Sequence, residues 1–341
     1  MNKKKPIVVF DFPGHPFQYD LSKKLSIIQD NPVIHIYNPS QLGPKTFFED
    51  SENFEVMKID KTLSRNHYKR LLDEFIFAFL LVKKINKINP SLLICSNNPL
   101  IPQLFIYYFC KIKKIKFVFW LQDIISIAAE NILKKQKNFF ANIVSNFFKK
   151  IEFYILENSD HIVTISPDFD TILDEKISNN KITCIPNWAP INDIPIMDKK
   201  NNFSVSNKLT DKFNILYSGT LGFKHNPDVL IGLAHFIKNK NLNINLVIVS
   251  EGPVVDYLKL ETKNLNLDSI IFLPFQDFQI FPEVLASADI SLVLLEKEAG
   301  EFSVPSKLLS ILCSGKIPIV FVPESNLSAK IVSRNNCGYN V

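Results

Sequence analysis

Short apolar runs, rich in β-branched and aromatic residues, alternate with longer stretches of helical periodicity along the whole chain. This alternation is typical of β-α-β units, which build parallel sheets covered by helices. The runs of the first half predict strands at residues 7–12, 33–37, 54–59, 92–96, 117–121, 161–165 and 182–185. Those of the second half predict strands at residues 213–218, 244–249, 270–273, 290–295 and 317–322. The pattern therefore predicts an α/β protein with two Rossmann-like, doubly wound parallel sheets.

The length of the chain, 341 residues, favours two domains, because one hydrophobic core seldom grows that large. Residues 191–211 are polar and without periodicity, so we place the linker there, between domains 1–190 and 212–341. Ligands of open α/β sheets bind at the carboxyl ends of the strands, which predicts a cleft faced by both domains. Residues 336–341 indicate a turn that enters one more strand, and from this we expect an incomplete C-terminal domain.

Composition places the protein in a reducing compartment. Apolar residues make up 46% of the chain, enough to fill two cores. The five cysteines are far apart and form no C-x-x-C pair, which favours free thiols. The apolar runs are too short for a signal peptide or a membrane span, so we predict a cytoplasmic location.

The formal net charge is +5, and the basic residues concentrate in the first half of the chain. No nucleic-acid recognition motif accompanies them, so they suit an anionic membrane surface better than nucleic acid. Residues 139–156 carry apolar side chains at helical spacing beside Lys149 and Lys150. This stripe is either part of a core or a contact with the inner face of the plasma membrane.

A glycine-containing turn, residues 217–227, follows the first predicted strand of the second half and precedes a helix beginning near Pro227. Gly222 lets the backbone approach a phosphate, and Lys224 adds a positive charge. The segment lacks the G-K-[ST] and G-x-G-x-x-G patterns, and an ordinary turn is the alternative.

Residues 298–307 precede the next helix, which Ser303 or Ser306 can cap and whose first turn suits Pro305. Lys307 in that first turn opposes the helix dipole, so a bound anion explains it better than a solvated lysine. Glu251, Gly252 and Pro253 begin another helix at a strand end, either as a binding turn or as a plain one.

In its motifs the sequence resembles the glycosyltransferases of family four, within the group that builds bacterial capsule, O-antigen and colanic-acid-type polysaccharides. The resemblance is carried by S-G-T-L-G-F-K-H-N-P at 218–227, E-G-P at 251–253, and the segments 272–289, 300–315, 120–123 and 186–189. It implies the GT-B fold, a nucleotide-sugar donor held mainly by the second domain, and a glycan or lipid-linked glycan acceptor held by the first.

The resemblance also implies roles for particular residues. Lys224 and the segment Ser303, Val304, Pro305, Ser306 and Lys307 would hold the diphosphate, with Gly222 in the preceding turn. Glu251, Gly252, Pro253, Phe275 and Gln276 would lie against the nucleoside, and Gly14, His15 and Asp123 would face the reacting sugar. The sequence departs from the family at Ser310, where many members carry a glutamate that binds the ribose.

Two features suggest metal chemistry at first sight. Asp168 and Asp170 form a D-x-D string, but they follow Ser166 and Pro167 at a helix start, where acids complement the dipole. The six histidines lack ligand spacing. We therefore expect no metal and no cofactor.

Together these observations predict a retaining, metal-independent hexosyltransferase that uses a nucleotide-diphosphate sugar. Two alternatives stay open: a nucleotide-sugar epimerase on the same fold, and a truncated, non-catalytic partner subunit that binds a nucleotide.

Overall fold

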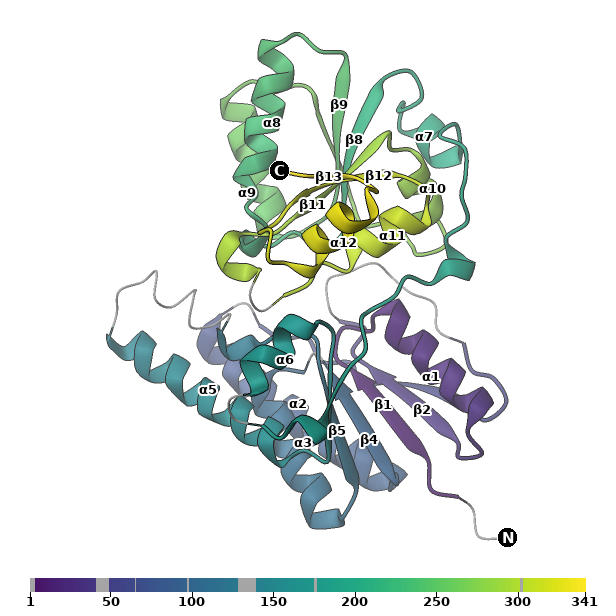
Figure 1. Ribbon diagram of the computed structural model, residues 1–341, viewed down its shortest axis with the longest axis vertical. Helices are drawn as coiled ribbons and strands as arrows, with labels where there is room; N and C mark the ends of the chain where they lie inside the picture. Colours follow the sequence, from purple (N-terminus) through teal and green to yellow (C-terminus); the bar gives the residue numbers. More distant parts are fainter. Residues whose placement is uncertain are drawn as a thin grey trace. The chain divides into compact units, whose positions relative to one another are not determined.

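The computed structural model of the protein describes residues 4–40, 49–64, 66–96, 98–127, 139–174, 177–300 and 303–341. These residues form two compact units, which divide the chain between Asn187 and Trp188. Figure 1 labels most of the helices and many of the strands of both units.

The first unit is built on a seven-stranded parallel sheet with the strand order β3-β2-β1-β4-β5-β6-β7. Its strands are β1 (Ile7–Asp11), β2 (Val33–Tyr37), β3 (Phe54–Lys58), β4 (Leu92–Ser96), β5 (Lys116–Leu121), β6 (His161–Thr164) and β7 (Ile182–Cys184). Every strand predicted for the first half is confirmed. β1 and β2 are buried along their whole length, as expected of parallel strands covered on both faces.

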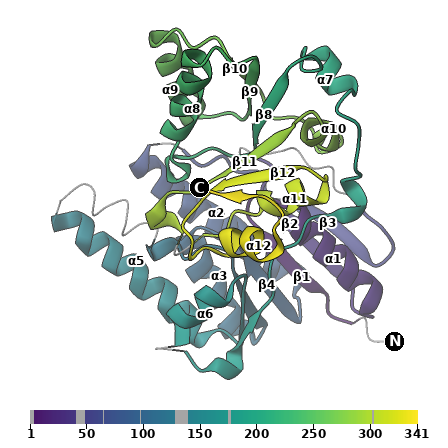
Figure 2. The ribbon, with the colours of Figure 1, turned by 45° about the horizontal axis from the view of Figure 1, so that its top comes forward.

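The helices of the first unit are α1 (Pro16–Ile28), α2 (His67–Ile88), α3 (Leu100–Lys113), α5 (Phe139–Asn158) and α6 (Pro167–Asp174), with the 3-10 helix η1 (Asn179–Lys181). Helices α2, α3 and α5 lie side by side on one face of the sheet, and α1 lies on the other (Figures 1 and 2). This division follows from right-handed crossovers, because the chain moves in opposite directions from β1 to β2 and from β3 to β4.

The second unit contains a six-stranded parallel sheet with the order β10-β9-β8-β11-β12-β13. Its strands are β8 (Phe213–Ser218), β9 (Ile244–Val249), β10 (Ile270–Leu273), β11 (Ile290–Leu294), β12 (Ile317–Phe321) and β13 (Tyr339–Asn340). All strands predicted for the second half are confirmed, and so is the further strand near the chain end, since β13 pairs in parallel with β12.

The helices of the second unit are α7 (Asn202–Ser206), α8 (Asp228–Asn239), α9 (Pro253–Asn264), α10 (Phe281–Ala286), α11 (Lys307–Cys313) and α12 (Leu327–Asn335). Three 3-10 helices accompany them: η2 (Ile191–Asp193), η3 (Phe223–His225) and η4 (Lys297–Ala299). Leu230 of α8 and Leu258 of α9 pack with Leu246 and Ile248 of β9 in the core.

Residues 191–211, which we expected as linker, lie within the second unit and contain η2 and α7. Asn201 caps α7 in a capping box with Ser204. The Glu283 carboxylate of α10 accepts a hydrogen bond from the Phe203 amide at 2.8 Å. A short helix therefore forms here without apolar periodicity, because its cap and a contact from α10 satisfy its first amides.

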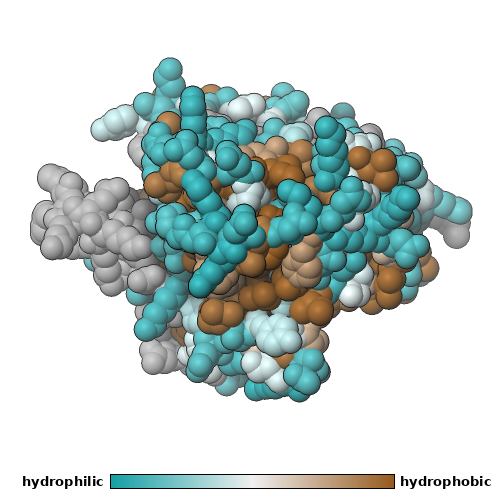
Figure 3. All heavy atoms as spheres, turned by 90° about the horizontal axis from the view of Figure 1, so that it is seen from above, coloured by the Kyte–Doolittle hydropathy of each residue, from teal (hydrophilic) through white to brown (hydrophobic). Residues whose placement is uncertain are grey.

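The surface of the second unit carries single exposed apolar residues such as Phe236 on α8 and Leu260 on α9. Figure 3 shows the face seen from above, where hydrophilic side chains cover most of the surface and apolar ones gather toward its middle. Among the described helices of both units, none combines the length and the apolar character that crossing a bilayer requires.

Candidate functional site

Two loops of the second unit meet because the strands before them are neighbours. β8 and β11 pair in parallel, so the turn after Ser218 and the segment after Leu294 emerge at the same edge of the sheet. The Glu296 amide donates to the Lys224 carbonyl at 2.8 Å and joins the two loops. The predicted phosphate-binding motifs thus come together at the carboxyl ends of the strands.

Gly219 makes the close approach between the turn and Lys307 possible. Its φ of +112° is a conformation that residues with a side chain rarely adopt. A Cβ atom at this position would lie 2.5 Å from Cε of Lys307. The glycine is therefore required both for the shape of the turn and for the space that Lys307 occupies.

The Lys307 ammonium is held by two neutral oxygens. Its Nζ donates to the Tyr217 hydroxyl at 2.6 Å and to the Thr220 carbonyl at 2.7 Å. The same atom lies 4.3 Å from the centre of the Tyr217 ring. Tyr217 is fully buried in β8, so its position is fixed by the core, and it fixes Lys307 in turn. Sequence reasoning missed this role of Tyr217, because a tyrosine in a predicted strand indicates only that the side chain packs in the core.

Lys224 lies on η3, and its Nζ donates to Oγ of Ser303 at 3.2 Å. Ser303 is buried and joins the second motif to the first. Lys224, Lys307 and Ser303 thus form one group, which we call the lysine cluster.

The lysine cluster has a positive electrostatic character. Burial, together with the charge of Lys224, lowers the pKa of Lys307 to about 7. Burial and the charges of Lys307 and Lys224 lower the pKa of His225 to about 2. The His225 imidazole is therefore neutral, and its Nδ1 accepts a hydrogen bond from the Gly222 amide at 2.8 Å. Each of these shifts relaxes when an anion offsets the charges.

Asn326, the N-cap of α12, holds the loop that carries Ser303. Its Nδ2 donates to the carbonyls of Gly300 and Ser303 at 3.1 and 2.9 Å, while its Oδ1 accepts from the Ser328 amide at 3.0 Å. Sequence reasoning missed this role of Asn326. An asparagine before an apolar helical run is a capping signal, but it does not reveal the contact with the loop that carries Ser303.

The structure corrects our expectation for the start of α11. The helix begins at Lys307, so Pro305 precedes its first turn, and Ser306 occupies the N-cap position without a side-chain cap bond. The φ and ψ of Ser306 are helical, whereas a residue that caps a helix with its side chain usually has an extended backbone. Ser303 bonds Lys224 in place of capping the helix. Val304 lies between these serines and is half-buried.

A second group forms after β9 and β10, which also pair in parallel. Oε2 of Glu251 accepts a hydrogen bond from the Phe275 amide at 3.4 Å. Gly252, with φ +115°, is the N-cap of α9, whose first residue is Pro253. Gln276 donates to the Pro274 carbonyl at 2.9 Å, which holds this turn in place. The two segments predicted beside a nucleoside are therefore neighbours.

The first unit brings together Asp11, Gly14, His15 and Asp123, and we call this group the histidine cluster. β1 and β5 flank β4, so the segments that follow them lie at one edge of the sheet. Gly14, with φ +77°, turns the chain so that the His15 amide bonds the Asp11 carboxylate. His15 Nδ1 lies 3.1 Å from the same carboxylate. Burial alone would lower the pKa of His15, but the charges of Asp11 and Asp123 outweigh it and raise the pKa.

Glu152 of α5 supports the loop beyond Asp123. Its buried carboxylate accepts hydrogen bonds from the Ile125 and Ser126 amides, both at 2.9 Å. Burial, with a smaller contribution from Asp123, raises its pKa to about 7. A glutamate inside an apolar helical stripe gave no sequence signal for this role.

The D-x-D string lies in the first turn of α6, as the helix-start interpretation predicts. Oδ1 of Asp170 accepts from the Thr164 hydroxyl at 2.5 Å. Within the described ranges, no group of three or more His, Cys, Asp or Glu side chains is arranged to hold a metal ion.

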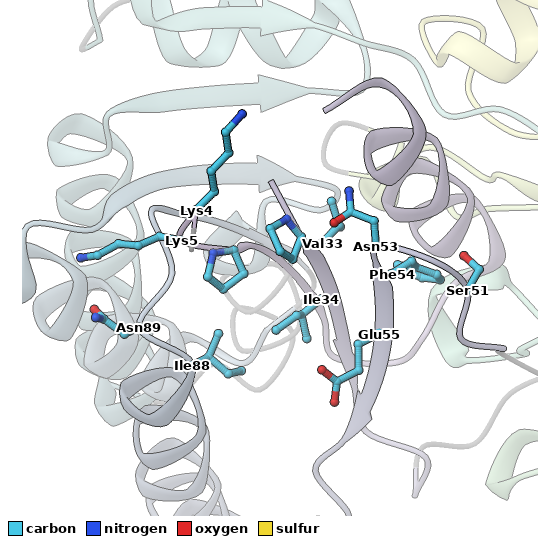
Figure 4. Close-up of a pocket in the computed structure, with 12 residues that line it drawn as sticks. Lys4, Lys5, Val33, Ile34, Ser51, Asn53, Phe54, Glu55, Ile88 and Asn89 are labelled. Carbon is cyan, nitrogen blue, oxygen red and sulfur yellow. The ribbon is translucent and has the colours of Figure 1, made fainter. Parts of the chain in front are cut away.

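A pocket of about 600 Å³ lies in the first unit, at the amino ends of β1, β2 and β3 (Figure 4). It is lined by Lys4, Lys5, Asn53 and Glu55, among others. Open parallel sheets bind ligands at the opposite, carboxyl edge, so we assign no function to this pocket.

Residues 198–341 match the family described as glycosyl transferases group 1. WcaI of Escherichia coli (strain K12), assigned as a colanic acid biosynthesis glycosyl transferase, is 27% identical over 164 residues, which are 47% of this chain and 40% of WcaI. The chain thus spans less than half the length of the curated relative it matches.

Among solved structures, Anabaena Alr3699/HepE in complex with UDP-glucose has a TM-score of 0.68 at 14% identity, covering 98% of this chain and 85% of that chain. WaaG, a glycosyltransferase involved in lipopolysaccharide biosynthesis, has a TM-score of 0.65 at 12% identity, covering 98% and 85%. A UDP-N-acetylglucosamine 2-epimerase from Listeria monocytogenes is less similar, with a TM-score of 0.59 at 8% identity, covering 93% and 79%.

The fold is that of the GT-B glycosyltransferases, two parallel-sheet α/β domains in one chain. Residues 198–341, which match the glycosyl transferases group 1 family, contain the lysine cluster.

Proposed function

We propose that the protein is a glycosyltransferase of surface-polysaccharide biosynthesis, which transfers a sugar from a nucleotide diphosphate to a glycan acceptor. The observation that carries this proposal is the lysine cluster. Lys224 and Lys307 are both half-buried after neighbouring strands of a parallel sheet, where the charge of Lys224 acts on Lys307. The match of this domain to glycosyl transferases group 1, and the relation to WcaI, support the same reaction class.

The chemistry of the leaving group explains why such a cluster is useful. Negative charge grows on the nucleoside diphosphate as the bond to the sugar breaks, and positioned donors stabilise that charge. Lys224 and Lys307 would be such donors, with the hydroxyl of Ser303 and amides of the glycine turn beside them. The donor's negative charge would in turn raise the pKa of Lys307 above its value of about 7 in the free protein, so that binding and protonation are coupled.

Glu251, Gly252, Pro253, Phe275 and Gln276 would hold the nucleoside. The backbone of the two turns provides hydrogen-bonding groups, and the half-buried Phe275 provides apolar surface. Since Ser310 stands where many family members have a glutamate, we propose that the carboxylate of Glu251, which is exposed, contributes to ribose recognition.

In the first unit, His15 and Asp123 would act on the sugar and its acceptor. The His15 side chain is 39% exposed, while its partner Asp11 is fully buried. A buried carboxylate that stabilises a protonated imidazole leaves the other ring nitrogen, Nε2, as a donor toward a sugar hydroxyl. We further propose transfer with retention of configuration, without a metal ion, to a lipid-linked acceptor.

The test is a screen of the purified chain against a panel of nucleotide-diphosphate sugars by thermal shift, followed by a transfer assay. A donor at about 100 times its Kd adds about 2.7 kcal/mol of stability. Transfer to a lipid-linked glycan with the anomeric configuration of the donor, in the presence of EDTA, is the expected result. A donor that binds and is never transferred to any acceptor would contradict the proposal.

The same assay separates the two alternatives. An epimerase converts the donor with no acceptor present, which analysis of the donor alone by NMR detects. A non-catalytic subunit binds the nucleotide and leaves donor and acceptor unchanged. The lower similarity to the epimerase structure makes the first alternative the weaker one.

A further inference from the structure

Helix α2 exposes an apolar stripe to solvent. Tyr68, Leu72, Phe75 and Phe79 follow one another at spacings of three or four residues, so they lie along one side of the helix. Tyr68 is 85% exposed and Phe79 is 67% exposed. Their neighbours Phe77 and Leu81 are fully buried and already anchor α2 on the sheet, so the stripe is not needed for the core.

The stripe continues onto α3. Phe105, Tyr108 and Ile112 are exposed at helical spacing, with Ile112 76% exposed. The rings of Phe75 and Phe105 meet edge to face with their centres 5.7 Å apart, which joins the stripes of α2 and α3. Single exposed apolar residues are ordinary on protein surfaces, but a contiguous patch of this kind marks an interaction site.

Helix α5 extends the patch. Tyr108 of α3 packs against Tyr154 of α5 with the ring centres 6.0 Å apart, and Ile143 and Phe147 of α5 are exposed. This refines our expectation for residues 139–156, because Ile155 is fully buried and belongs to the core. Among its side chains whose burial the structure describes, the apolar stripe predicted on α5 therefore divides between the core and the surface.

Basic residues accompany the patch. Both α2 and α3 run antiparallel to the strands that follow them, so their last turns lie at the same end of the unit. Exposed lysines gather there: Lys83, Lys87, Lys111, Lys113 and Lys114. The acids of α2, Asp73 and Glu74, form ion pairs with Lys61 and Arg70. The helix dipole explains lysines in a last turn, but it does not explain the exposed aromatic residues beside them.

We propose that the exposed face of α2, α3 and α5, here called the α2–α3 face, docks on an anionic lipid bilayer. Its aromatic and aliphatic side chains enter the headgroup region while the lysines contact acidic lipid phosphates. The combination favours a bilayer over a protein partner, because protein interfaces are depleted in lysine and the five exposed lysines outweigh Glu157, the exposed acid in the last turn of α5. The proposal goes beyond sugar transfer, and its test needs no substrate.

The experiment is flotation of the full chain with vesicles of phosphatidylglycerol and phosphatidylcholine, compared with vesicles of phosphatidylcholine alone. We expect binding to the anionic vesicles that weakens at 0.5 M salt. The variant Leu72→Ser/Phe79→Ser loses about tenfold or more in binding, because it removes apolar surface from the membrane. Each lysine near an anionic surface contributes about fivefold, so Lys83→Glu/Lys87→Glu/Lys113→Glu should abolish binding.

The matched control is Phe236→Ser, which removes a 52% exposed phenylalanine from α8 of the second unit and should bind vesicles as the wild type does. Circular dichroism melts verify that each variant is folded. Equal binding to neutral and anionic vesicles, or unchanged binding by both patch variants, overturns the proposal. A wild-type dimer in sedimentation equilibrium that Phe79→Ser dissociates also overturns it, since the face would then be a contact between copies of this chain.

Discussion

The lysine cluster of the second unit and the histidine cluster of the first occupy equivalent places, at the carboxyl edges of their sheets, and yet they balance charge in opposite ways. His15 lies beside the buried carboxylate of Asp11, and the charges raise the pKa of one and lower that of the other. Burial and, to a smaller extent, the charge of Lys224 lower the pKa of Lys307 to about 7, and its ammonium bonds neutral oxygens. The histidine cluster is stabilised by its own ion pair, whereas the lysine cluster would be stabilised more by a bound anion.

The largest expected effect concerns Lys224. Because removal of one positioned donor typically costs about 2.7 to 4 kcal/mol of transition-state stabilisation, Lys224→Ala should lower kcat by about 10² to 10³. The fold should persist, and the initial rate of sugar transfer measures the effect. Lys263→Ala, which removes an exposed lysine from the last turn of α9, is the control and should retain full activity. Undiminished transfer by Lys224→Ala would show that the lysine cluster does not take part in the reaction.

Gly219→Ala should weaken donor binding by displacing Lys307. The added Cβ both strains a residue with φ +112° and meets Cε of Lys307 at 2.5 Å, at a cost of about 1 to 3 kcal/mol. Calorimetric titration with the nucleotide-diphosphate sugar found in the donor screen and urea denaturation measure the two consequences. The control is Gly232→Ala on α8, where no atom lies within 4 Å of the new Cβ and the helix gains about 0.5 to 1 kcal/mol. Equal behaviour of the two variants would mean that the turn does not position Lys307.

The pH dependence of donor binding should follow Lys307. Its folded pKa of about 7 means that the free enzyme loses this positive charge as the pH rises above 7. Donor affinity should therefore fall by up to about tenfold per pH unit above 7. The fall should end where the pH reaches the pKa of Lys307 in the complex with the donor. Lys307→Arg keeps its charge throughout this range, so its Kd should vary less with pH. Parallel pH profiles for the wild type and Lys307→Arg would refute the assignment.

The smallest effect is expected in the histidine cluster. Since the folded pKa of His15 is raised, its pairing with Asp11 stabilises the protein fully below the unfolded pKa of 6.5, and the benefit is lost as the pH rises through the folded pKa. His15→Ala should lower the free energy of unfolding by about 0.5 to 1 kcal/mol at pH 5.5, after discounting for solvent screening, and by less at pH 8.5. Urea denaturation at the two pH values checks this, and an equal loss at both would contradict it.

The strands were predictable because each is a short, nearly continuous apolar run, and in a parallel sheet such a run is buried on both faces. The site was predictable only in part. Glu251 and Phe275 lie in turns, and Lys224 and Lys307 lie at helix starts, where small residues and helix-start signals are visible in the sequence. Tyr217 and Asn326 were not, because a strand tyrosine and a helix-capping asparagine carry the same local signal whether or not they support a site.

The sequence by itself determined the order of strands and helices, the two-sheet α/β architecture, and the position of the charged turns after the strands. Only the tertiary structure decided which turns are neighbours, since that depends on the spatial order of the strands, in which β8 lies beside both β9 and β11. It also decided that Lys307 bonds Tyr217, and that the exposed apolar stripes of α2 and α3 meet at Phe75 and Phe105. These outcomes depend on contacts between residues far apart in the chain, which local periodicity cannot encode.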